Sequence, residues 1–168
     1  SPRPARFMRE EDPEQEGNGG RTWYLSTGVD QIEPSTFGDS LAQLELLVRD
    51  IKWSIGPAPL YLLGCDQGAV LSLCLGAAIP DLVAGVIAVD GYLPSMPAVT
   101  ELMVASKSLG VLMVNDPSRC LAERRIVSSS VERLVAVGAR VCRVDFGVST
   151  AGPEGLADRI ADWWRIEM

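Results

Sequence analysis

A carboxylate bracketed by glycines is the part of this sequence best suited to chemistry. Asp66 lies in the stretch Gly64-Cys65-Asp66-Gln67-Gly68, which follows an apolar run and precedes a helical apolar stripe. This order predicts a strand, a tight turn and a helix, with small residues where the strand and the helix nearly collide. The turn would project Asp66 over the top of a sheet, where its carboxylate could serve as a nucleophile or as an acid/base group.

A histidine base is missing from this sequence. None of the 168 residues is histidine, which is the usual general base at neutral pH and a common metal ligand. The cysteines lack the spacing of metal ligands, and most lie in apolar segments, so we expect free, buried thiols in a reducing compartment, the cytoplasm. They are Cys65, Cys74, Cys120 and Cys142. We expect neither a metal nor a cofactor.

Length, composition and charge restrict the class of protein. The chain is long enough for one domain with a proper core, and 47% of its residues are hydrophobic and 22% charged. No apolar run approaches the ~20 residues that span a bilayer. The formal net charge of −7 argues against nucleic acid, because phosphate backbones are bound by clustered lysines and arginines. We therefore expect binding neither to nucleic acid nor to membranes.

Helical and strand patterns alternate along the chain, which predicts an α/β fold with a doubly wound, mostly parallel sheet flanked by helices. Apolar runs predict buried strands at 60–65, 83–89 and 110–116, and alternation predicts an edge strand at 139–146. Helical periodicity covers 34–55, 67–79 and 118–137 and begins again near 153. Residues 95–108 are ambiguous. We expect an exposed arm at 1–20 and a single domain at 21–168.

Two of the predicted helices allow more detailed expectations. Ser35 or Thr36 is expected to cap the helix at 34–55. In the helix at 118–137, the periodicity places Leu121 and Val135 on the inward face and Arg133 on the outward face. In the last helix, two adjacent tryptophans at 163 and 164 cannot both face the sheet.

The turn and two later stretches resemble the α/β-hydrolase superfamily, and within it the carboxylesterase/phospholipase branch. That branch has an elbow of the form Gly-Phe-Ser-Gln-Gly-Gly, and residues 64–69 here read Gly-Cys-Asp-Gln-Gly-Ala. Residues 90–94, Asp-Gly-Tyr-Leu-Pro, match its Ser-Gly-Trp/Tyr-Leu-Pro. The resemblance runs from about Trp23 to the C-terminus. It implies an α/β-hydrolase-like sheet that lacks the first strands and the oxyanion loop.

The resemblance also implies where a site would lie. Asp66 stands where the branch has its nucleophilic serine, and Asp116, followed by Pro117, stands near its catalytic aspartate as a remnant acid. Where the branch carries Gly-x-Gly-His, residues 146–152 read Phe-Gly-Val-Ser-Thr-Ala-Gly, without the base. A binding site for a small apolar ligand would use Gln67, Gly68, Tyr92 and Leu93.

Two functions from different classes fit these residues. The first is a degenerate α/β-hydrolase that lacks hydrolytic activity and acts in binding or assembly. The second is an active enzyme with changed chemistry. Asp66 would be a nucleophile, as in haloalkane dehalogenases, or Asp66 or Asp116 would be the lone acid/base of a cyclase or lyase. Hydrolysis of an aspartyl ester would still require a base to activate water.

The resemblance implies that the first strands of the sheet are missing, and this leads to an expectation about oligomeric state. A strand near the middle of the sheet, at 60–63 or 83–89, would become an edge with no charge to discourage pairing. We therefore expect a homodimer, or a partner segment that completes the sheet.

Overall fold

A computed structural model describes residues 22–167, without the side chains of 148–151, 153 and 167. The expected arm at 1–20 lies outside this part. The strands are β1 (Ser26–Gly28), β2 (Gln31–Ile32), β3 (Tyr61–Cys65), β4 (Gly85–Val89), β5 (Gly110–Asn115) and β6 (Arg140–Asp145). The helices are α1 (Pro34–Ile55), α2 (Gln67–Ala78), α3 (Pro97–Leu102), α4 (Leu121–Ala136) and α5 (Val148–Glu167).

A four-stranded parallel sheet forms the centre of the molecule. Its strands lie in the order β3-β4-β5-β6, and each pairs in parallel with the next. The predicted α/β fold with a parallel sheet is confirmed. The carboxyl ends of all four strands therefore meet at one edge, where the turns that follow them can place side chains together. The antiparallel hairpin of β1 and β2 was not predicted, because it is short and its turn residue Asp30 has a positive φ of 59°.

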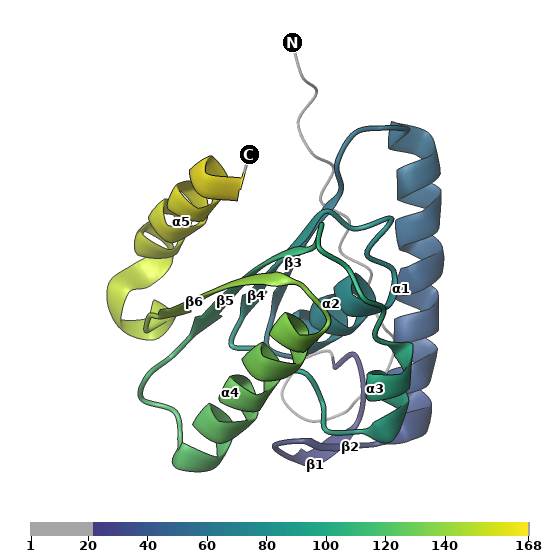
Figure 1. The fold of residues 1–168 in the computed structure, drawn as a ribbon. Helices are drawn as coiled ribbons and strands as arrows, with labels where there is room; N and C mark the ends of the chain where they lie inside the picture. The colour runs from purple at the N-terminus through teal and green to yellow at the C-terminus, as the bar shows by residue number, and fades with distance from the viewer. Residues whose placement is uncertain (1–21, 168) are drawn as a thin grey trace.

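Helices cover both faces of the sheet unequally. Figure 1 shows α1, α2, α3 and α4 on one side of the sheet and α5 alone on the other. The first side holds the larger core, to which β4 and β5 contribute Val86, Val111 and Met113. On the second side Ile87 and Leu112 pack with the α5 residue Trp163, which is 3% exposed. The adjacent Trp164 is 36% exposed, so only one of the two tryptophans is buried.

The start of α1 is capped by a residue that the sequence analysis did not select. The carboxylate of Glu33 accepts hydrogen bonds from the backbone N–H groups of Ser35 (3.0 Å) and Thr36 (2.7 Å). The prediction of Ser35 or Thr36 as the cap is wrong, because Pro34 already occupies the first helical position and the cap must precede it. The helix ends at Ile55, before Gly56, as predicted.

Three side chains of α4 lie on the opposite face from the one predicted. Leu121 and Val135 are 56% and 54% exposed, whereas Arg133 is half-buried and donates hydrogen bonds to the carbonyl of Pro94 (2.8 Å) and the hydroxyl of Thr100 (2.9 Å). Arg133 thereby ties α4 to the segment before α3. Periodicity identifies an inward stripe, but it cannot show that a long cation will satisfy buried carbonyls at the margin of that stripe.

The expectation of mostly buried cysteines is also wrong. All four are free, and only Cys74 is buried, while Cys65, Cys120 and Cys142 are exposed. Cys65 ends β3, which lies at the margin of the described sheet. The pKa of the Cys74 thiol is raised to about 12 because burial disfavours the thiolate.

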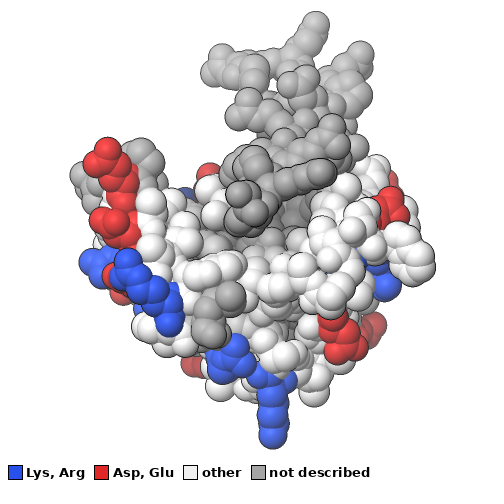
Figure 2. All heavy atoms as spheres, turned by 90° about the horizontal axis from the view of Figure 1, so that it is seen from above, with Lys and Arg blue, Asp and Glu red and all other residues white. Residues whose placement is uncertain are grey.

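The surface carries charges of both signs. In Figure 2, acidic and basic side chains lie scattered around the rim of the face shown, and uncharged residues make up most of that face. Within residues 22–167, no helix is long and apolar enough to cross a membrane. The same residues contain no cluster of three or more histidine, cysteine or acidic side chains placed to hold a metal ion.

Candidate functional site

Asp66 occupies the strained turn between β3 and α2. Its backbone has φ 48° and ψ −116°, a conformation that side-chain-bearing residues rarely adopt and that typically marks a functional position. The backbone N–H of Asp66 still donates to the carbonyl of Val89 on β4 (2.9 Å), so the turn is fixed to the sheet. Its carboxylate is 75% exposed and projects above the strand ends. The predicted strand, turn and helix are present, and we call residues 64–68 the elbow.

Two glycines allow α2, the helix that follows the elbow, to approach the sheet closely. A Cβ on Gly64 would overlap the backbone of Gly68 and Ala69 at distances that real Cβ atoms do not reach. A Cβ on Gly91 would lie 2.5 Å from the Cβ of Ala69. Gly68 is different, since a Cβ there would meet only the Trp23 indole nitrogen at 3.8 Å. Gly64 and Gly91 are therefore required by space, whereas Gly68 is not.

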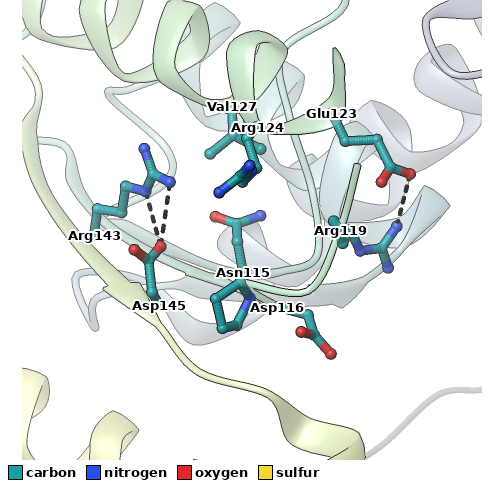
Figure 3. Close-up of a pocket in the computed structure, with 9 residues that line it drawn as sticks. Asn115, Asp116, Arg119, Glu123, Arg124, Val127, Arg143 and Asp145 are labelled. Carbon is teal, nitrogen blue, oxygen red and sulfur yellow. Dashed lines mark hydrogen bonds and ion pairs between the residues drawn. The ribbon is translucent and has the colours of Figure 1, made fainter. Parts of the chain in front are cut away.

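An arginine from the start of α4 connects three carboxylates beside the elbow. One guanidinium nitrogen of Arg119 lies 3.2 Å from the Asp66 carboxylate and 3.3 Å from that of Asp90. The other lies 3.4 Å from Glu123, which Figure 3 marks with a dashed line. Burial alone would lower the pKa of Arg119, but Asp90, Glu123 and Asp66 outweigh it, and the pKa is raised. Arg119 is therefore a permanent cation at this site.

Besides Asp66, Arg119 contacts the carboxylate of Asp90, which the sequence analysis did not select as a site residue. Asp90 follows β4 directly, has a positive φ of 56° and a carboxylate that is only 17% exposed. It accepts a hydrogen bond from the backbone N–H of Asp116 (2.8 Å). The Asp116 carboxylate instead accepts from the N–H and hydroxyl of Ser118 (2.8 and 2.7 Å). The two predicted catalytic carboxylates, Asp66 and Asp116, thus have different partners.

A cavity of about 230 Å³ lies over the elbow. Its charged lining is the ion-pair group just described, and Ser26, Gln67 and Asn115 are its other polar residues. The remaining walls come from the β1–β2 hairpin, α2, α4 and the segment after β4. The apolar and aromatic residues of the lining are Tyr24, Val29, Val70, Tyr92 and Val127. Tyr24 is buried, which together with Tyr92 and other nearby groups raises its pKa well above the ordinary range. It stays a neutral phenol at physiological pH.

The four predicted binding residues do not all line this cavity. Tyr92 lines the cavity, and its hydroxyl accepts a hydrogen bond from the backbone N–H of Asp30 (2.9 Å). Gln67 also lines the cavity, but its amide accepts from the Trp23 N–H (2.7 Å) and donates to the Tyr24 carbonyl (2.9 Å).

Gly68 and Leu93 do not belong to that lining. Leu93 is 1% exposed in the core, and its N–H donates to the hydroxyl of Ser130. The prediction therefore fits the lining at Gln67 and Tyr92 only. Sequence reasoning missed Asp90, Arg119 and Glu123. Asp90 had a usable signal, since a polar residue directly after a buried parallel strand lies at the functional edge of the sheet.

No protein-family model matches the sequence, and no curated protein matches it. Solved structures share its architecture. A variant of SOBER1 from Arabidopsis thaliana matches with a TM-score of 0.69 and 18% identity, over 88% of this chain and 74% of that one. The Bacillus cereus carboxylesterase matches with a TM-score of 0.69 and 13% identity, over 91% and 72% of the two chains. The chain has the α/β-hydrolase fold.

A third solved structure with a similar fold comes from another bacterium. The phospholipase/carboxylesterase from Dyadobacter fermentans matches with a TM-score of 0.57 and 24% identity, over 76% of this chain. The present chain spans between 60% and 74% of the length of these three proteins. The expected α/β-hydrolase fold is confirmed. At such low identities the likeness concerns the fold, so activity has to be argued from the site.

Proposed function

We propose that this α/β-hydrolase-fold chain is a binding protein without hydrolytic activity. The observation that carries the proposal is Arg119, which stands beside the elbow carboxylate of Asp66 at 3.2 Å. Ester hydrolysis needs a group there that accepts a proton from a nucleophile or from water. A guanidinium has five donors and no acceptor, and it is not deprotonated in proteins. The sequence contains no histidine that could take this role.

The neighbouring carboxylates do not replace the missing base. Asp90 and Glu123 both contact Arg119, so each of these carboxylates already pairs with a cation at this site. The contact of Arg119 with the largely buried Asp90 fixes the guanidinium, whereas the exposed Asp66 adds at most ~1 kcal/mol. Asp66 is thus a loosely held charge above the cavity.

The ligand that suits the elbow cavity is small and mainly apolar. A volume of about 230 Å³ lies below that of typical pockets for drug-sized molecules. Three valines and two tyrosines line the cavity, while the charged groups at one end pair with one another. A small ester or ketone could place its alkyl part against the valines without breaking an ion pair.

Ethyl acetate is a suitable probe, because binding and hydrolysis can be followed in one NMR sample. We expect saturation transfer from the protein to ethyl acetate and no formation of acetate. Val29→Phe fills the cavity from a partly exposed position in the hairpin turn, so it should weaken the transfer. Leu46→Phe is the matched control, since Leu46 is exposed on α1 away from the cavity. Steady acetate formation, or equal transfer in both variants, would contradict the proposal.

A second function is favoured by the elbow itself. The strained backbone and the 75% exposure of the Asp66 carboxylate are suited to nucleophilic attack. On an alkyl halide, a carboxylate oxygen would form a C–O bond while the C–halogen bond breaks and halide leaves with the electron pair. Without a base the alkyl ester would persist. Intact-mass measurement after incubation with 1-bromobutane should show a butyl adduct that Asp66→Asn abolishes, if this second function holds.

A further inference from the structure

A buried amide oxygen without a partner lies at the end of β5. Asn115 is 5% exposed, and its side-chain nitrogen donates to the carbonyl of Gly91 (3.2 Å). Because that carbonyl can only accept, the amide nitrogen must face it and the oxygen must face away. The oxygen has no hydrogen-bond partner among the described residues. Leaving a buried acceptor unsatisfied costs ~1–3 kcal/mol, so this oxygen calls for a donor.

The oxygen faces a small cavity of about 110 Å³ between β5, β6 and the start of α4. In Figure 3 the Asn115 side chain lies between two ion pairs, with its oxygen on the side of Arg143. One pair joins Arg143 to Asp145 (3.2 Å), and the other joins Arg119 to Glu123 (3.4 Å). The volume corresponds to about three or four waters, which is room for a compact molecule of a few non-hydrogen atoms.

Among the described residues, the side chain of Arg124 lies at this cavity without a hydrogen-bond or ion-pair partner. It lies above Asn115 in Figure 3 and lines the cavity, but no hydrogen bond or ion pair joins its guanidinium to another described residue. Arg124 and Arg143 also line an open groove of about 450 Å³ along α4, which leads to the cavity from solvent. A ligand entering along this groove would meet the free guanidinium first and the amide oxygen beyond it.

We propose that this cavity binds a small carboxylate that carries a hydroxyl or ammonium group on the adjacent carbon. The carboxylate pairs with the Arg124 guanidinium, whose fork matches two carboxylate oxygens. The neighbouring O–H or N–H donates to the Asn115 oxygen and removes its unsatisfied state. Simple carboxylates lack this donor, and simple alcohols lack the charge for Arg124. This binding goes beyond the proposed function, because it does not depend on whether Asp66 reacts.

Three probes of similar size test this proposal by titration calorimetry on the full chain. Lactate and alanine both carry a carboxylate with an adjacent donor, and propionate has the same carbon skeleton without one. We expect lactate or alanine to bind about tenfold more tightly than propionate, since a site that hydrogen-bonds a donor rejects the analogue lacking it. Tighter binding of lactate identifies a hydroxyl as the donor, and tighter binding of alanine identifies an ammonium group. Equal binding of all three, or no binding of lactate and alanine at about 10 mM, would overturn the proposal.

Two neighbouring arginines provide the matched variants. Arg124→Gln should weaken binding of the preferred probe about tenfold, because it removes the charge that holds the carboxylate. Arg125→Gln should leave binding within about twofold, since Arg125 lines the outer groove but not the cavity. Both residues are exposed on α4, so both variants should fold. Equal loss of affinity in the two variants would show nonspecific attraction to the groove and would contradict the site.

Discussion

At the scale of single residues, the site is defined by the contact between the Arg119 guanidinium and the elbow carboxylate of Asp66 (3.2 Å). The turn at Asp66 was predictable because its signal is local, a glycine pair between an apolar run and a helical stripe. Arg119 was not, since its contact with Asp66 spans 53 residues of sequence and depends on how α4 begins relative to β4. The role of Asp116 stays a prediction. It lies directly after β5, as expected, and its carboxylate accepts hydrogen bonds from Ser118.

The four thiols should react with iodoacetamide in a defined order. In the folded protein at about pH 8, we expect Cys120 and Cys142 to be alkylated readily because both are exposed. Cys65 is also exposed, but partial burial and the charges of Asp66 and Asp90 raise its pKa, so it should react more slowly. Cys74 should react only after unfolding. Peptide mass mapping over time checks this order, and early labelling of Cys74 would contradict the packing of α2.

At the scale of elements, helices and strands were predictable because each buries a regular apolar stripe or run. Their ends were less so. The cap of α1 is a glutamate, and the side-chain directions of α4 at Leu121, Arg133 and Val135 reversed the expected pattern. At Glu33 and Arg133 specific hydrogen bonds decided the outcome, and such bonds are not encoded in periodicity.

The Glu33 cap makes the stability of α1 depend on pH. Hydrogen bonds from Thr36 and Ser35 lower the pKa of Glu33, so it stabilises the folded state above the pKa that glutamate has in the unfolded chain. This stabilisation is lost as the pH falls through the lowered pKa. Glu33→Ala should therefore reduce the free energy of unfolding more at pH 7 than near about pH 3. Urea denaturation at both pH values measures this difference, and an equal loss at both would exclude the charged cap.

The contact between the elbow strand and helix gives a prediction with an internal control. Gly64→Ala should destabilise the protein by about 1–3 kcal/mol or more, because the added methyl group would overlap the backbone of Gly68 and Ala69. Gly38→Ala, in α1, should stabilise it by about 0.5–1 kcal/mol, since nothing lies within 4 Å of the new Cβ. Urea denaturation provides both free energies of unfolding. Similar effects of the two substitutions would show that α2 does not approach β3 as closely as described.

At the scale of the whole molecule, the parallel sheet was predictable from the alternation of elements, while the unequal cover of its faces was not. Of the helices that the structure describes, only α5 lies on the second face (Figure 1). Within residues 22–167, β3 pairs with β4 alone, and Leu63 on β3 is 60% exposed. Because this edge of β3 is exposed within the described residues, we still predict a homodimer.

Light scattering at low micromolar concentration should give twice the 18.1 kDa of one chain. Leu63→Lys should shift the mass toward the monomer, because a charge at an exposed edge position opposes pairing. Leu46→Lys, on the outer side of α1, should not. A stable monomer in the unsubstituted protein would contradict this prediction.

The central claim is that an α/β-hydrolase fold here carries a site that does not hydrolyse esters. Its most direct test is the steady-state hydrolysis of a p-nitrophenyl ester by the purified chain and by Asp66→Asn. We expect both proteins to show only the background rate, because Arg119 beside the elbow cannot accept a proton and the sequence has no histidine. A steady-state rate above background that Asp66→Asn abolishes would contradict the account.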